Sequence, residues 1–139
     1  MNATKALKAS IIVQWVVIPL SLVIGMYEES FLPETLKLFI ESEAEKELSS
    51  TEIITFSISI IFLVAYIVTN IAIFLLRGWA RKPYTILVFS SFALYFVIGP
   101  IVSTPASSSL DYISSLAIGI SIGLLYYSSA SEHFEKPLK

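Results

Sequence analysis

The chain has no cysteine, a single histidine and few charged residues, and each shortage limits its chemistry. Without cysteine, the chain cannot perform disulfide-relay or quinone-linked thiol chemistry, which needs reactive thiols. Charged residues make up 14% of its 139 residues, whereas soluble proteins carry roughly 25%. Lys, Arg, Asp and Glu are absent from four runs: 9–26, 53–76, 83–110 and 112–131.

Hydrophobic residues fill these charge-free runs and make up 55% of the chain. An apolar, uncharged run of about 18 residues or more is long enough to cross a bilayer as a helix. The sequence therefore predicts a single-domain, all-α membrane protein, an antiparallel four-transmembrane-helix bundle. The predicted spans are about 7–26, 53–76, 84–102 and 110–128. No small-residue cleavage site follows the first run, so we expect it to be retained as a span rather than removed as a secretory signal.

Basic residues are divided unevenly between the two sides of this predicted bundle. Lys and Arg near span ends mark the cytoplasmic side. With four spans, the N-terminal segment, the loop after the second span and the C-terminal tail share one side. They hold most of the nine cations: Lys5, Lys8, Arg77, Arg81, Lys82, Lys136 and Lys139. We therefore expect a multi-pass protein with both termini in the cytoplasm. The net charge of −2 and the lack of a basic stripe argue against a nucleic-acid partner.

The loop between the second and third predicted spans, within FLLRGWARKPYTIL, combines cations with an aromatic ring. Arg77, Arg81 and Lys82 can reach lipid phosphates, and Trp79 can lie at the headgroup level. We interpret these four residues as a cytoplasmic anchor in the lipid bilayer. A basic docking site for a partner or a specific lipid is the alternative.

The same region resembles a group of known sequences. The R-x-W-A-R element from Arg77 to Arg81 is similar to the middle loop of small bacterial four-span inner-membrane proteins of unassigned function. The segment DYISSLAIGISIGLLYYSSASEHF is similar to their last helix. The resemblance covers residues 74–134 and differs at Ser129, where that group often has proline. It implies a fold and a location in the bacterial inner membrane, and it implies no activity.

The segment between the first and second predicted spans is acidic, and its apolar residues recur at helical spacing. It predicts an amphipathic extracytoplasmic helix over about 33–48. Ser49 with Glu52 fits a capping box for the second span, and Ser108 with Asp111 offers a similar start for the fourth. Glu41 and Glu45 belong to a solvated face or form an acidic landing site for a basic partner.

Small and polar residues fall on one face of every predicted span when 100° per residue is applied. Because lipid cannot hydrogen-bond a side chain, we expect these faces to meet. Gln14, Asn70 and Ser91 lie at similar depth and predict a buried polar layer, with Tyr66 and Tyr95 beside it. The layer serves either as helix–helix contact or as a ligand pocket or conduit.

On the fourth span, the small face consists of Ser115, Gly119, Gly123 and Tyr126. We expect it to point towards the shared axis, where Gly119-x-x-x-Gly123 permits close helix approach. The same motif could instead bind a protein partner or a second copy of the chain.

The sequence carries no recognisable catalytic motif, and its predicted spans lack the buried ionisable groups of proton-coupled carriers. His133 lies beside two carboxylates, and we interpret this segment as a solvated tail rather than a metal site. We therefore expect no enzyme activity, no cofactor and no metal. The leading hypothesis is an accessory or immunity-type protein that binds a membrane-acting partner. The alternative is a channel or carrier for a small neutral solute.

Overall fold

A computed structural model describes residues 2–28, 32–44, 49–95 and 104–135, and these contain helices and turns but no strand. The helices are α1 (Ala3–Glu28), α2 (Glu34–Ala44), α3 (Ser50–Phe74), α4 (Arg81–Tyr95), α5 (Pro105–Tyr127) and α6 (Glu132–Glu135). Two short 3-10 turns, η2 (Gly78–Ala80) and η3 (Ser129–Ser131), precede α4 and α6.

Three of these helices are long and apolar enough to cross a membrane, over Ala3–Tyr27, Ser50–Phe74 and Pro105–Tyr127. They correspond to the first, second and fourth predicted spans, and they give the chain the character of a helical membrane protein. The third predicted span, 84–102, is described only as far as Tyr95, the last residue of α4. The four-span bundle therefore stays a prediction.

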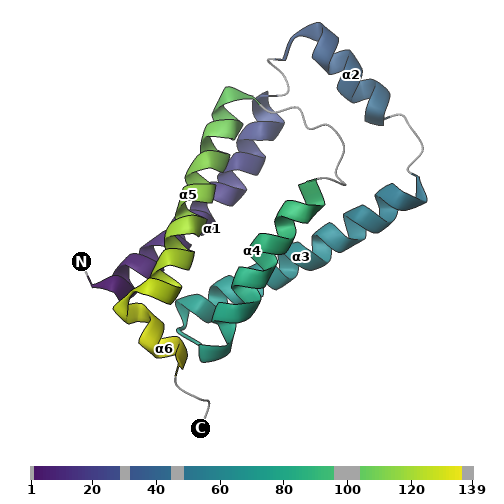
Figure 1. The fold of residues 1–139 in the computed structure, drawn as a ribbon. Helices are drawn as coiled ribbons and strands as arrows, with labels where there is room; N and C mark the ends of the chain where they lie inside the picture. Colours follow the sequence, from purple (N-terminus) through teal and green to yellow (C-terminus); the bar gives the residue numbers. More distant parts are fainter. Residues whose placement is uncertain (1, 29–31, 45–48, 96–103, 136–139) are drawn as a thin grey trace.

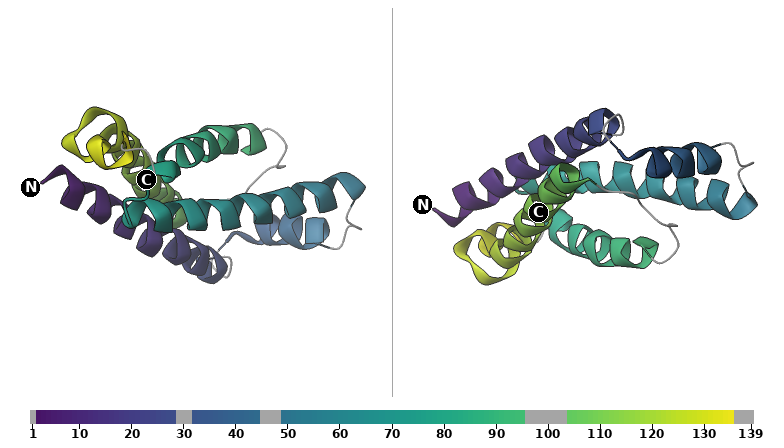
Figure 2. Two further views of the ribbon diagram at one scale, coloured as in Figure 1. Left: turned by 90° about the horizontal axis from the view of Figure 1, so that it is seen from below. Right: turned by 90° about the horizontal axis from the view of Figure 1, so that it is seen from above.

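The long helices form two pairs, α1 with α5 and α3 with α4 (Figures 1 and 2). The pairs come together near η2 and α6 and diverge towards α2 (Figure 1). The start of α1 and helix α6 lie at the end where the pairs meet, and α2 lies at the opposite end (Figure 1). The placement of both termini on one, cytoplasmic side of a membrane stays a prediction.

Helix α5 packs against α1 with mostly small side chains. The buried residues of α5 are Ser107, Ser114, Ala117, Ser121 and Leu125. Their spacing of three, four or seven residues keeps them on one face. Small side chains let two membrane helices approach closely and gain dispersion contacts. This pair forms the most extensive helix contact of the described chain.

The start of α3 follows the predicted capping box. The Glu52 carboxylate accepts from the Ser49 N–H at 2.6 Å, and the Ser49 Oγ accepts from the Glu52 N–H at 3.2 Å. These two bonds satisfy backbone donors that the first helical turn leaves without partners.

The predicted start of the fourth span at Ser108 and Asp111 is wrong. Helix α5 begins at Pro105 with Thr104 as its N-cap, because proline suits the first helical position and threonine caps well. Asp111 therefore lies inside the helix, where its carboxylate accepts a hydrogen bond from the Ser21 Oγ of α1 at 2.8 Å.

Helix α3 ends in a reversal that leads into η2. The Leu76 N–H donates to the Ile73 carbonyl and the Arg77 N–H to the Ala72 carbonyl, each at 2.8 Å. These are the two bonds of a Schellman motif. Leu76 occupies its left-handed position with φ of 55°, a conformation that usually favours glycine.

The helix predicted over 33–48 is present as α2 from Glu34 to Ala44, and residues 45–48 lie outside the described residues. Leu38 is 59% exposed on it. Its amphipathic role at a membrane surface stays a prediction.

Candidate functional site

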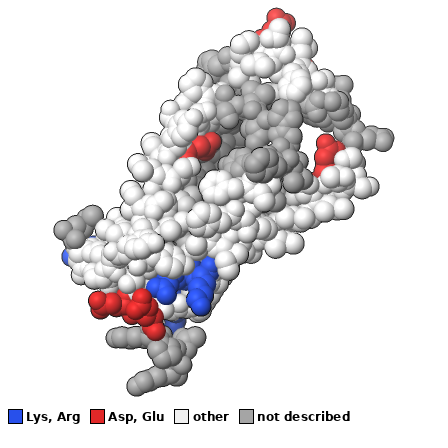
Figure 3. All heavy atoms as spheres, viewed as in Figure 1, with Lys and Arg blue, Asp and Glu red and all other residues white. Residues whose placement is uncertain are grey.

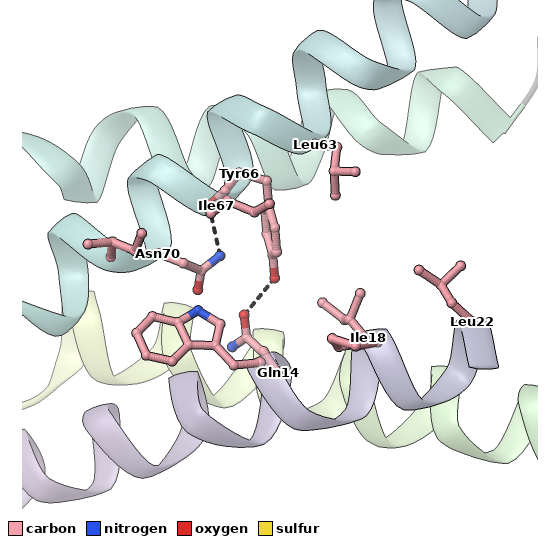
Figure 4. A pocket seen from close by; sticks show the side chains of 10 residues that line it. Gln14, Ile18, Leu22, Leu63, Tyr66, Ile67 and Asn70 are labelled. Carbon is pink, nitrogen blue, oxygen red and sulfur yellow. Dashed lines mark hydrogen bonds between the residues drawn. The ribbon is translucent and has the colours of Figure 1, made fainter. Parts of the chain in front are cut away.

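Gln14 lies at the centre of a polar cluster that joins all four long helices. Its side chain is fully buried in the middle of α1. Its Nε2 donates to the Ser121 Oγ of α5 at 2.9 Å. Its Oε1 accepts from the Tyr66 hydroxyl of α3 at 2.6 Å (Figure 4) and from the Tyr84 hydroxyl of α4 at 3.2 Å. Two donors satisfy both lone pairs of this oxygen, so the amide is bound on both sides.

Ser121 connects the amide to a second serine on α1. The Ser121 Oγ lies 2.7 Å from the Ser10 Oγ and donates to the Ala117 carbonyl at 2.9 Å. Ser10 and Ser121 are both buried. Because hydrocarbon offers no hydrogen-bond partner, these mutual bonds stabilise the contact of α1 with α5.

The two tyrosines hold the α3–α4 pair to the same amide. The rings of Tyr66 and Tyr84 stack with centroids 5.8 Å apart, and Tyr84 is fully buried. Since both hydroxyls donate to one oxygen, a single glutamine joins the two helix pairs at the point where they meet. The cluster contains amides and hydroxyls and no ionisable carboxylate, amine or imidazole.

Asn70 lies beside the cluster and is only partly satisfied. Its side chain is 1% exposed, and its Nδ2 donates to the Tyr66 carbonyl at 3.0 Å. Its Oδ1 is buried and accepts no hydrogen bond from the described residues. A buried acceptor without a hydrogen bond costs free energy.

Ser91, also predicted for the polar layer, makes its hydrogen bond within its own helix. The Ser91 Oγ donates to the Val88 carbonyl of its own helix at 2.7 Å. The Tyr95 side chain lies outside the described part of the structure.

A groove of about 470 Å³ runs between α1 and α3 next to the cluster. Its α1 wall consists of Gln14, Trp15, Ile18, Pro19 and Leu22. Its α3 wall consists of Leu63, Tyr66, Ile67, Asn70 and Ile71. Figure 4 shows the labelled side chains of both walls directed into this space, with the Asn70 amide near Gln14 and Tyr66. The volume lies in the range of small-molecule sites.

A second hollow of about 350 Å³ lies between the helix pairs and reaches Ser91. It shares Ile18, Leu63 and Tyr66 with the groove, so these three side chains separate the two spaces.

The predicted cytoplasmic anchor is divided between exposed and bound side chains. Arg77 and Lys82 are exposed, and Trp79 is 45% exposed. Arg81 instead lies over the Tyr126 ring at 4.9 Å, with its Nη1 3.5 Å from the Glu135 carboxylate. The cations of this face gather at the end near the chain termini (Figure 3).

The C-terminal segment packs against this end of the bundle. The Phe134 side chain is 6% exposed and belongs to the main hydrophobic cluster. The prediction of a solvated tail is therefore wrong at Phe134, because burying an aromatic ring outweighs the freedom of a short terminal segment. His133 itself is exposed, as predicted for a tail residue.

The prediction that the small face of the fourth span points to the shared axis is wrong at Ser115 and Gly119, whereas the Tyr126 hydroxyl lies 3.1 Å from the Thr85 Oγ1 of α4. Ser115 and Gly119 are exposed, whereas Ser121 faces α1. A Cβ built on Gly119 or Gly123 would meet nothing within 4 Å. Both faces of α5 carry side chains small enough for close packing. The serine face packs against α1 because it also forms hydrogen bonds with that helix.

The acidic landing site predicted on the outer helix is described in part. Glu41 is exposed on α2, and Glu45 lies outside the described residues.

Ser10, Ser121 and Tyr84 were not among the residues predicted for the polar layer. The seven-residue spacing of Ser107, Ser114 and Ser121 was a signal for one packed face of a helix. The pairing of Tyr84 with Gln14 had no comparable signal, because the two residues are 70 positions apart.

Within the described ranges, no group of three potential metal-ligating side chains occurs. Comparisons with protein-family models, with curated proteins and with solved structures find no match. The fold and site therefore define the chain as an all-helical, membrane-type protein with three candidate spans and a neutral polar cluster where its helix pairs meet. The resemblance of residues 74–134 to small bacterial inner-membrane proteins stays a prediction.

Proposed function

We propose that this chain is a non-enzymatic, four-span protein of a bacterial inner membrane that works by binding another membrane protein. Accessory and immunity-type proteins act in this way. The proposal includes cytoplasmic termini, so that α2 with its acidic Glu41 faces the other side. In this proposal, α1, α3 and α5 cross the lipid bilayer and contact its lipids.

The single observation that carries the proposal is the free small face of α5. Gly119 and Gly123 have open space where a side chain would be, although the opposite face of the same helix is packed against α1. Their directions lie roughly 150° to 170° from the packed face on an ideal helix. A face of this kind lets a further helix approach closely, which is the main source of helix association in lipid.

The alternative, a channel or carrier for a small neutral solute, has less support. A conduit needs polar groups that can exchange partners with the solute. Gln14, Ser121 and Tyr84 bind each other and are fully buried, so these groups favour a structural contact.

In-membrane photocrosslinking tests the binding proposal. A photoreactive amino acid replaces Leu116, which is 66% exposed and one turn from Gly119. The matched control carries the same amino acid at Phe56, which is 69% exposed on α3. We expect a discrete protein adduct from position 116 and lipid adducts from position 56.

The double variant Gly119→Val, Gly123→Val should fold normally and lose the protein adduct, since the new side chains occupy the approach path. Two differently tagged copies of the chain, expressed together, distinguish a homo-oligomer from a different partner. Lipid adducts alone at both positions would refute the proposal.

A further inference from the structure

The groove between α1 and α3 has almost entirely apolar walls. The Ile18 and Leu22 side chains of α1 lie across this space from Leu63 and Ile67 of α3 (Figure 4). Leu22 is 66% exposed and Leu63 is 50% exposed, so the groove is open to the surroundings of the protein. In a bilayer these surroundings are acyl chains, which offer no hydrogen-bond partners and need none.

The groove fits an acyl chain better than a further helix. Helices approach one another closely in lipid where their surfaces carry Gly, Ala, Ser or Thr. None of the described residues that line the groove is of these types, and most are Ile, Leu, Trp or Tyr. An acyl chain is narrow and flexible, so it can follow the spaces between such bulky side chains. The open Gly119 face of α5 has the opposite character.

A cation lies beyond the end of the groove that Trp15 and Ile71 line. The Trp15 and Phe74 rings are in contact, with centroids 5.2 Å apart. The Lys8 amine lies 5.1 Å from the centroid of the same Phe74 ring. Lys8 is half-buried and pairs with no carboxylate of the described residues. The Phe74 ring therefore connects the apolar groove to a positive charge that the described chain leaves unneutralised.

We propose that this groove binds an anionic phospholipid, with one acyl chain between α1 and α3 and the negatively charged head at the Lys8 amine. The chain follows from the apolar walls, and the charge of the head follows from the amine, since basic sites between membrane helices attract anionic lipid heads. Lys5 is exposed one turn earlier and adds a second cation at this end. The inference rests on the membrane location in the proposed function and not on its α5 face.

The positions along α1 place the head and the chain at matching depths. Lys8 lies about 10 Å before Trp15 along the helix, and Leu22 lies about 10 Å after it. The head therefore lies towards the end where the helix pairs meet, and the chain points towards the end where they diverge (Figure 1). This is the end that we propose to be cytoplasmic, where anionic lipids attract basic segments.

Photolabelling with two phospholipids that differ only in their heads tests this inference. The probes are phosphatidylglycerol and phosphatidylcholine with the same diazirine-labelled acyl chain. The full chain is reconstituted in phosphatidylcholine nanodiscs with a trace of either probe, and mass spectrometry measures the label on the groove residues. We expect at least about five-fold more labelling by phosphatidylglycerol, the factor for one cation beside an anionic lipid. Unlabelled phosphatidylglycerol should compete with this labelling.

Matched variants separate the head from the chain. Lys8→Gln should reduce the preference for phosphatidylglycerol about five-fold, and Lys8→Arg should retain it. The control Lys82→Gln removes an exposed cation from α4 at the same end of the protein and should leave the preference unchanged. Leu63→Trp narrows the groove and should lower groove labelling by both probes. Its control is Ile61→Trp, because Ile61 is 66% exposed and does not line the groove.

Equal groove labelling by the two probes, or a preference that is unchanged in Lys8→Gln, would overturn the inference. A cross-linked dimer from a photoreactive amino acid at Ile67, without lipid adducts, would also overturn it and assign the groove to a second copy of the chain. These results would leave the crosslink from position 116, which tests the α5 face, unaffected. A chain without lipid label at any position would instead refute the membrane location that both proposals need.

Discussion

Replacing Gln14 by leucine is the most direct perturbation of the contact between the two helix pairs. Leucine has similar bulk and removes both polar groups of the amide. The variant therefore loses the bonds to Ser121, Tyr66 and Tyr84 while it retains most of the packing. The two tyrosine hydroxyls lose a buried acceptor at the same time, and Tyr84 has no exposed surface from which to reach water.

The expected loss can be worked out from these three bonds. Side-chain hydrogen bonds between membrane helices average about 0.6 kcal/mol and reach about 1.7 kcal/mol. Three such bonds give a loss of about 2 to 5 kcal/mol in the free energy of unfolding. Tyr84→Phe removes one of them and should cost about 1 kcal/mol. Because both changes affect the same bond, the double variant should lose less than the sum of the single losses.

Unfolding in mixed micelles, titrated with a denaturing detergent and followed by tyrosine and tryptophan fluorescence, measures these differences. Ser91→Ala is the matched control, because its hydroxyl bonds only to its own helix and should change stability by less than about 0.5 kcal/mol. A Gln14→Leu variant as stable as the parent chain, or strictly additive effects with Tyr84→Phe, would refute the role assigned to the cluster.

Two further predictions concern the packing around this cluster. Phe134→Ala should lower the free energy of unfolding by about 3 kcal/mol because the ring is 6% exposed, and Phe134→Leu should recover most of it in the same titration. Ser121→Leu should cost about 1 to 3 kcal/mol, because the α1–α5 contact has no room for a larger side chain. Ile120→Leu, on an exposed face of α5, is its control, and equal losses in the two variants would contradict the observed packing.

Several features could be predicted from local sequence. The three long helices follow from uncharged apolar runs, since the length of a run is a property of one segment. The Ser49–Glu52 cap has the same origin, because both partners lie within one turn. The start of α5 was predicted incorrectly because two competing start signals occur within a few residues, and the proline at position 105 is the stronger one.

The depth of Gln14 and Asn70 also followed from counting along each span, and the structure buries both. The hydrogen-bond partners of these two residues could not be predicted in this way. Gln14 binds residues 52, 70 and 107 positions away, and no local pattern indicates which hydroxyls meet it. Sequence alone could not show that α5 packs against α1 with its Ser121 face rather than its Gly119 face, because this depends on the rotation of α5 about its own axis.

The sequence alone determined that this chain is apolar, helical and able to cross a membrane, because hydropathy and helix length are properties of consecutive residues. Only the tertiary structure decided which faces pack and where Gln14 finds its donors. In lipid, every apolar face is equally well solvated, so the rotation of each helix depends on small contacts and hydrogen bonds between distant segments.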